Sequence, residues 1–142
     1  MLLVKSQNTE KIEINAIAAI KYSILKASPG RDIIFDLGKS LSYEGDSGPY
    51  LQYALVRAKA VLKKGEAEGV KASFDHAPEE VSELARRITR FPRVVLRYAP
   101  LSSPNLLVTY LTELASAFNA YYAVEKIVDA RDPLSPYRLA LA

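Results

Sequence analysis

Apolar residues recur at helical spacing along most of the chain, and breaker residues separate the segments that carry this pattern. The first such segment, residues 12–27, predicts a helix ended by the Ser-Pro-Gly sequence at residues 28–30. The face expected to be buried consists of Ala16, Ile17, Ile20, Ile24 and Leu25. Residues 33–35, Ile-Ile-Phe, then predict a short strand or extended piece.

A long helix is predicted to begin at residues 46–49, Asp-Ser-Gly-Pro. Asp46 or Ser47 can cap free backbone amides, and a proline early in a helix sacrifices no hydrogen bond. The apolar stripe expected along this helix is Leu51, Ala54, Leu55, Ala58 and Leu62. Lys-Lys-Gly at residues 63–65 predicts its end, and the polar residues 66–77 predict a surface loop.

Two further helices follow from the same signals. Residues 78–80, Pro-Glu-Glu, predict a helix start with acids near the positive end of the dipole. Its expected buried stripe is Val81, Leu84, Ala85 and Ile88. Pro92 predicts a break, followed by a short helix over residues 94–98.

A second long helix is predicted after Ser-Ser-Pro at residues 102–104. Its helical face extends over about five turns and consists of Leu107, Tyr110, Leu111, Leu114, Phe118 and Tyr122. Residues 135–142 begin like a third capped helix, and the sequence stops after roughly two turns. These patterns predict an all-α helical bundle.

Length and composition fit one compact soluble domain. The chain has 142 residues, of which 49% are hydrophobic and 25% charged, a balance that supports a packed core. No stretch approaches the ~20 apolar residues needed to cross a bilayer, and the apolar start is too short for a signal peptide. The absence of cysteine fits a reducing compartment, so we expect a cytoplasmic protein without membrane contact.

Recognisable catalytic signatures are missing from the sequence, which has no phosphate-binding Gly-rich loop, no GxSxG turn and no paired histidines. His76 is the single histidine and lies in the polar loop, so we interpret it as a surface residue. The carboxylates beside Gly and Pro are interpreted as helix caps: Glu44, Asp46, Glu79 and Glu80. We therefore predict no catalytic, cofactor-binding or metal-binding residue.

Two kinds of side chain point to nucleic acid instead. Arginines at helical spacing form a stripe that can bind phosphates if the helical path continues through Pro92: Arg86, Arg90, Arg93 and Arg97. Charge runs more often mark a solvated face, and Pro92 is expected to bend the path. Tyrosines on both long helices can stack unpaired bases, although half-buried tyrosines are common in helical cores.

Residues 35–54, FDLGKSLSYEGDSGPYLQYA, resemble arginyl-tRNA synthetases where the catalytic domain passes into the anticodon-binding helices. Residues 16–35 resemble the approach to that junction. Downstream, LARRI at 84–88, FPRVV at 91–95 and RLAL at 138–141 are similar to the anticodon-binding helices of the family. The resemblance divides the chain into a junction segment, residues 1–45, and an anticodon-binding helical bundle, residues 46–142, whose last helix is cut off.

The resemblance implies a partner and a set of contact residues. The partner is the anticodon arm of the tRNA for arginine, and the expected RNA-binding residues are Tyr50, Tyr53, Arg57, Asn119 and Tyr122. Stacking on rings and positioning of phosphates are their expected roles. Two positions depart from the family: Arg93 replaces the acid usual after Phe-Pro, and Leu55 stands where many members have histidine.

The HIGH-type and KMSKS-type motifs that handle ATP in this family do not occur in the sequence. We therefore expect the chain by itself to be inactive in arginine–tRNA ligation and to bind no cofactor, with ATP used by the full-length enzyme. A catalytic domain that is missing, or encoded separately, remains an open alternative. A further alternative is a helical protein-interaction module, derived from a synthetase, that no longer binds RNA.

Overall fold

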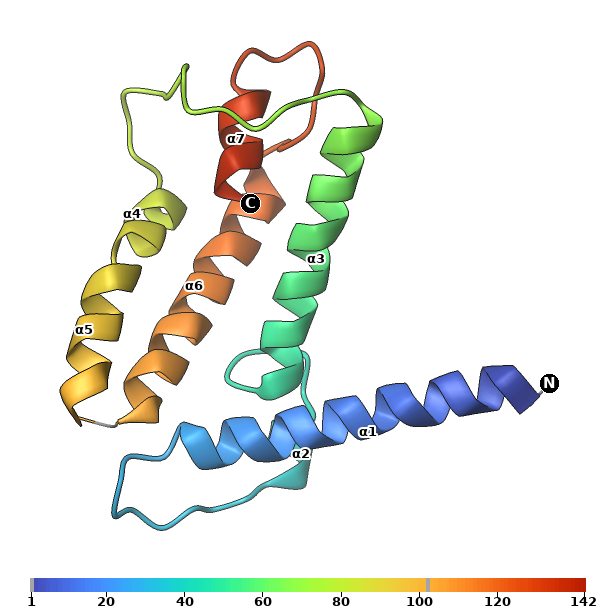
Figure 1. Ribbon diagram of the computed structural model, residues 1–142, viewed down its shortest axis with the longest axis vertical. Helices are drawn as coiled ribbons and strands as arrows, with labels where there is room; N and C mark the ends of the chain where they lie inside the picture. The colour runs from blue at the N-terminus through green and yellow to red at the C-terminus, as the bar shows by residue number, and fades with distance from the viewer. Residues whose placement is uncertain (1, 102) are drawn as a thin grey trace. The chain divides into compact units, whose positions relative to one another are not determined.

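The computed structural model describes residues 2–101 and 103–142, and every regular element assigned there is an α-helix (Figure 1). The predicted all-α fold is therefore confirmed. The helices are α1 Leu2–Leu25, α2 Leu37–Ser40, α3 Gly48–Ala67, α4 Glu83–Thr89, α5 Phe91–Leu101, α6 Pro104–Val124 and α7 Ser135–Leu141. Residues 32–36 have no regular structure, so the predicted piece at 33–35 forms no strand. None of the helices in the described ranges is long and apolar enough to cross a membrane.

Contacts along the chain define two compact units, and each is described by itself. The first unit comprises Met1–Tyr53 with Val94–Thr112, and the second comprises Ala54–Arg93 with Glu113–Ala142. The first unit therefore holds α1, α2, the start of α3, most of α5 and the first part of α6. The second unit holds the rest of α3, α4, the start of α5, the last part of α6 and α7.

In the first unit, α1 packs through a different face from the predicted one. Ala19 is 1% exposed and Tyr22 is 6% exposed. The predicted isoleucines are instead between 43% and 50% exposed: Ile17, Ile20 and Ile24. The face of α1 with small residues is covered because α3 begins directly against it. The approach is so close that a Cβ on Gly48 would lie 2.5 Å from the carbonyl oxygen of Ala18. The spacing identified residues that share a face, but not which face is covered.

A polar network around Tyr22 joins three segments of the first unit. The Tyr22 hydroxyl donates a hydrogen bond to the carboxylate of Asp46 and lies 2.6 Å from Oγ1 of Thr112 on α6. Lys26 Nζ lies 2.6 Å from the other carboxylate oxygen of Asp46. Burial first, and the hydrogen bond to Asp46 second, raise the pKa of Tyr22 far above its usual value. The hydroxyl therefore remains a donor, and the end of α1 is tied to the start of α3.

Helix α3 begins as predicted but ends later. Ser47 is the cap, because its Oγ accepts a hydrogen bond from the backbone N–H of Tyr50 at 3.1 Å. Gly65 does not end the helix, which continues to Ala67. A Cβ on Gly65 would lie 2.5 Å from Cδ2 of Leu139, so the close approach of α7 explains this glycine.

The buried stripe of α3 is also only partly the predicted one. Ala54 is buried as expected, but Leu55 is 54% exposed and Leu62 is 43% exposed. Val61, which lies outside the predicted stripe, is 6% exposed. In the second unit, the covered face of α3 therefore contains Ala54 and Val61 instead of the two leucines.

Helix α4 begins later than residues 78–80, because Ser82 provides its cap and accepts a hydrogen bond from the Ala85 N–H at 3.2 Å. Within the predicted buried stripe of this helix, Leu84 and Ala85 are buried, whereas Val81 and Ile88 are exposed. The break near Pro92 is confirmed: α4 ends at Thr89 and α5 begins at Phe91. α5 is longer than predicted, and the predicted capping residue Ser102 before α6 lies outside the described residues.

Candidate nucleic-acid interface

Three of the five expected RNA-binding residues meet in the second unit. Arg57 comes from α3, while Asn119 and Tyr122 are three residues apart on α6 and so share one helix face. Arg57 Nη1 donates a hydrogen bond of 2.8 Å to Oδ1 of Asn119. The Arg57 guanidinium carbon lies 4.6 Å from the ring centroid of Tyr122. We call these three residues the Arg57 cluster.

The geometry of the Arg57 cluster suits recognition of an unpaired nucleotide. Asn119 fixes the guanidinium, and a cation over an aromatic ring within about 6 Å is attracted to the ring face. Phe118, which is buried, supports the ring from within α6 at a centroid distance of 6.2 Å. Tyr122 nevertheless remains 42% exposed. The cluster thus combines a held positive charge with accessible aromatic surface.

A hollow of about 350 Å³ opens beside Tyr122, between α3 and the segment that follows α6. It is lined by Ala60, Val61, Lys64, Tyr122, Glu125, Lys126, Ile127 and Val128. Its apolar wall is well packed, since Val61, Ile127 and Val128 are each at most 6% exposed. An apolar wall next to an aromatic ring can receive a flat base that has left its helical stack.

Two lysines give this hollow a positive rim. Lys64 Nζ lies 3.6 Å from Glu68, and Lys126 Nζ lies 2.7 Å from Asp129. The hydrogen bond to Asp129 raises the pKa of Lys126, so its ammonium group stays charged. Exposed ion pairs of this kind contribute little to stability, and either lysine can exchange its carboxylate for a phosphate.

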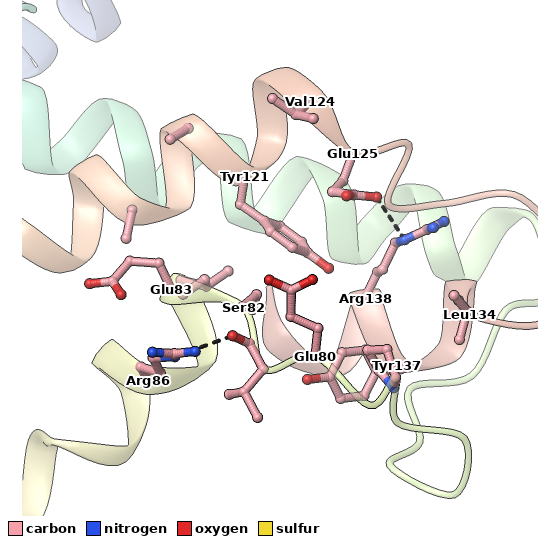
Figure 2. Close-up of a pocket in the computed structure, with 15 residues that line it drawn as sticks. Glu80, Ser82, Glu83, Arg86, Tyr121, Val124, Glu125, Leu134, Tyr137 and Arg138 are labelled. Atoms are coloured by element: carbon pink, nitrogen blue, oxygen red, sulfur yellow. Dashed lines mark hydrogen bonds and ion pairs between the residues drawn. The ribbon is translucent and has the colours of Figure 1, made fainter.

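Arg138 on α7 holds the segment that forms the hollow. Its Nε lies 3.0 Å from the carboxylate of Glu125, and its Nη1 lies 2.5 Å from Asp132. The same Nη1 donates to the backbone carbonyl of Lys126 at 3.3 Å. Figure 2 shows the Arg138 side chain directed at Glu125. One guanidinium therefore fixes the end of α6 and the loop that leads to α7.

Ser135 fixes the same loop from inside the unit. Its side chain is fully buried, and its Oγ donates to the carbonyl of Ile127 at 2.9 Å while accepting from the N–H of Asp129 at 2.9 Å. The predicted start of α7 at this residue is confirmed, although Ser135 does not act as its cap. The hydroxyl instead satisfies two backbone groups of the loop, which places Lys126 beside Tyr122.

A larger hollow of about 650 Å³ lies elsewhere in the second unit, between the start of α4 and the facing parts of α6 and α7 (Figure 2). Its charged lining contains three carboxylates and two guanidinium groups: Glu80, Glu83, Glu125, Arg86 and Arg138. The Arg86 Nε donates to the carbonyl of Val81 at 3.2 Å. The net negative lining disfavours an anionic ligand, so the hollow beside Tyr122 is the better site for RNA.

Tyr50 and Tyr53 belong to the first unit and are described there. Both lie near the start of α3, where Tyr50 is half-buried and Tyr53 is 43% exposed. Neither ring is sealed inside its unit. Their contact with RNA stays a prediction.

The remaining candidates from the sequence are His76 and the carboxylates interpreted as helix caps. His76 lies on an exposed part of the loop between α3 and α4, as expected. Across residues 2–101 and 103–142, no group of three acidic, histidine or cysteine side chains is placed to hold a metal ion. Asp46 serves the Tyr22 network rather than a helix cap.

Lys64 and Lys126 are candidate functional residues that the sequence pattern did not single out. Lys126 lies four residues after Tyr122, a spacing that would place both on one face if α6 continued. The helix ends at Val124, so this signal is misleading by itself. Lys64 comes near Lys126 only through the packing of α3 against the loop, which no local pattern reveals.

Comparisons with known proteins agree on one family. The family described as the DALR anticodon binding domain matches residues 51–142. The chain is 38% identical to the arginine–tRNA ligase of Methanoregula boonei, with 89% of the chain and 22% of the relative covered. It is 32% identical to the arginine–tRNA ligase of Pyrococcus furiosus, with 98% of the chain and 24% of the relative covered.

A solved structure shows the same fold. The structure titled Thermus thermophilus arginyl-tRNA synthetase matches with a TM-score of 0.73 and 33% sequence identity, covering 89% of this chain and 23% of that one. The chain thus spans about a quarter of the length of each protein that it matches here.

Proposed function

Because the chain belongs to the family of DALR anticodon-binding domains, we propose that it binds the anticodon arm of a tRNA through the Arg57 cluster and the hollow beside it. The contact between Arg57 and the partly exposed Tyr122 ring is the observation that carries this proposal. Anticodon loops expose unstacked bases, and such bases are recognised by stacking on aromatic rings and guanidinium planes.

In this proposal, different residues of the site contact the bases and the phosphate backbone of the RNA. An unstacked base enters the hollow against Tyr122 and the apolar wall, where stacking is worth roughly 1–3 kcal/mol per base. Lys64 and Lys126 at the rim neutralise the adjacent phosphates, which position the RNA without reading its sequence. Asn119 holds Arg57 in place and offers hydrogen-bonding capacity next to the base.

We further propose that the tRNA is the one that accepts arginine, since the curated relatives are arginine–tRNA ligases. Attachment of arginine, with its use of ATP, is assigned to a catalytic domain outside these 142 residues. This assignment is supported by the absence of HIGH-type and KMSKS-type motifs from the sequence. In this proposal the chain binds the anticodon arm of the tRNA and contributes no catalytic group.

Fluorescence anisotropy tests the proposal with the 142-residue chain, an arginine-accepting tRNA and an unrelated tRNA. The expected result is tighter binding of the arginine-accepting tRNA at moderate salt. A second pair of RNAs, the isolated anticodon stem-loop and the same stem with an altered loop, locates the recognition. Equal affinity for all four RNAs, or no binding, would overturn the proposed function.

A further inference from the structure

The positive charge of the chain is concentrated in one short segment of the second unit. Residues 83–93 contain four arginines and one glutamate, which gives this segment a net charge of +3. The whole chain also has a net charge of +3, so the remaining residues sum to zero. Such a local excess attracts an anionic partner to this segment rather than to the surface as a whole.

Among the described residues, ion pairs involve one of these four arginines, Arg87. Arg87 lies 2.6 Å from Glu83 and also pairs with Glu113 on α6, so the single acid of the segment is already engaged. The hydrogen bond from Arg87 lowers the pKa of Glu83, which keeps this pair charged. Arg90 and Arg93 are exposed, and neither forms an ion pair with the described residues. Their guanidinium groups are accessible to solvent.

Arg90 and Arg93 lie close together at the junction between α4 and α5. Arg90 ends α4 in the right-handed helical conformation, with φ −77° and ψ −16°, and α5 begins at the next residue. Pro92 is the second residue of α5, where a missing N–H costs no helical hydrogen bond. Arg90 and Arg93 therefore lie at the junction of the two helices, three residues apart in the sequence.

We propose that Arg90 and Arg93 form a second RNA-binding surface that holds the phosphate backbone of the same tRNA away from its anticodon bases. The inference rests on the proposed function. Guanidinium groups match phosphate oxygens in a two-pronged geometry, which favours arginine over lysine at such contacts. Arg90, Arg93 and the Arg57 cluster all belong to the second unit. Backbone contacts of this kind add affinity without distinguishing sequences.

The test compares the 142-residue chain with the double variant R90Q/R93Q by titrating both tRNAs at several salt concentrations. Each lost phosphate contact lowers the slope of log affinity against log salt by about 0.7–0.9, so two losses lower it by about 1.5. We expect about 30-fold weaker binding near 0.1 M salt, equally for both tRNAs. The preference for the arginine-accepting tRNA should stay unchanged.

The matched control is K71Q/R131Q, which removes two exposed positive charges from loops of the same unit. This control should bind almost like the unaltered chain. Equal losses in the two double variants, or an unchanged salt slope in R90Q/R93Q, would overturn the inference. Loss of binding to anionic phosphatidylserine vesicles with unchanged RNA binding would also overturn it, because the surface would then serve a membrane.

The two proposals fail differently. If the unaltered chain binds neither tRNA, both are wrong. If it prefers the arginine-accepting tRNA but R90Q/R93Q keeps the full salt slope, only the backbone surface is wrong. Circular dichroism of each variant verifies that the exposed substitutions leave the helices intact.

Discussion

At the scale of single residues, the candidate interface depends on how one ring is held. Tyr122 contacts the guanidinium of Arg57, lines the hollow and packs against Phe118, and it is still partly exposed. A side chain placed in this way contributes little to the core and much to a surface that stacks on a base. Binding and stability should therefore respond differently to its removal.

Tyr122→Ala is expected to weaken binding of the arginine-accepting tRNA by about 5- to 150-fold, the equivalent of the roughly 1–3 kcal/mol that stacking on one base contributes. Tyr122→Phe should retain most of the affinity, because the ring face and its contact with Arg57 remain. Anisotropy titrations at one fixed salt concentration measure both variants, and urea unfolding reports their stability.

Tyr43→Ala serves as the matched control, since Tyr43 is 58% exposed and belongs to the first unit, outside the Arg57 cluster. It should leave affinity within about twofold, as expected for a surface residue without a role in stacking. Equal losses in Tyr122→Ala and Tyr43→Ala would show that aromatic surface in general, rather than the cluster, attracts the RNA.

At the scale of elements, close helix packing decides which faces are buried. Gly48 begins α3 so near to α1 that an added Cβ would meet backbone atoms of Ala18 at 2.5 Å and 2.7 Å. Backbone of a packed helix cannot rotate away as a side chain can. We therefore regard this contact as the point that fixes α3 against α1 within the first unit.

Gly48→Ala is expected to lower the free energy of unfolding by about 1–3 kcal/mol, the usual cost of overpacking, even though alanine favours a helix more than glycine does. Urea unfolding followed by circular dichroism measures the change. Gly38→Ala is the control, because the nearest atom to its added Cβ is a carboxylate oxygen of Asp36 at 3.4 Å. A Gly48→Ala variant as stable as Gly38→Ala would show that α1 and α3 are less closely packed than described.

The same contacts explain what the sequence could and could not predict. Helical spacing and proline-flanked starts identified the existence of α3, α6 and α7, because these signals are local. The start of α4 after its cap Ser82 depends on which of several possible caps is used. The glycine at position 65, inside α3, is explained by the close approach of Leu139, which is distant in sequence. The exposure of Ile17 and Leu55 likewise depends on which neighbours cover the helix.

In the candidate site, too, some residues could be predicted from the sequence and others could not. Arg57, Asn119 and Tyr122 were selected from the family resemblance, and the structure brings these three together. The lysine rim was not foreseen, because Lys64 and Lys126 approach one another through a loop that Arg138 and Ser135 fix. The family resemblance identified residues on the helices, whereas the hollow also depends on the loop that joins α6 to α7.

At the scale of the whole molecule, each unit is held by a separate set of charged contacts. In the first unit, burial opposes ionisation of Asp46, but hydrogen bonds from Lys26 and Tyr22 outweigh it and lower its pKa. In the second unit, the backbone N–H of Leu134 and then Arg138 lower the pKa of Asp132. Neither carboxylate is deeply buried, so solvent screens both contributions.

These lowered pKa values determine how the free energy of unfolding changes as the pH falls. A carboxylate whose pKa is lower in the folded state than its unfolded value near 4 stabilises the fold above about pH 4, and it loses that contribution as the pH falls through the folded pKa. We therefore expect the free energy of unfolding to change little between about pH 5 and 8 through these groups, and to fall below about pH 4.

Asp46→Asn and Asp132→Asn should each be less stable than the unaltered chain at neutral pH, because each loses an ion pair with Lys26 or Arg138. Each should also show a shallower fall in stability below about pH 4, since the substituted group no longer takes up a proton. The measurement is urea unfolding at a series of pH values. The two substitutions lie in different units without a shared partner, so their effects should add in the double variant. An acid response as steep in the double variant as in the unaltered chain would mean that other carboxylates dominate it.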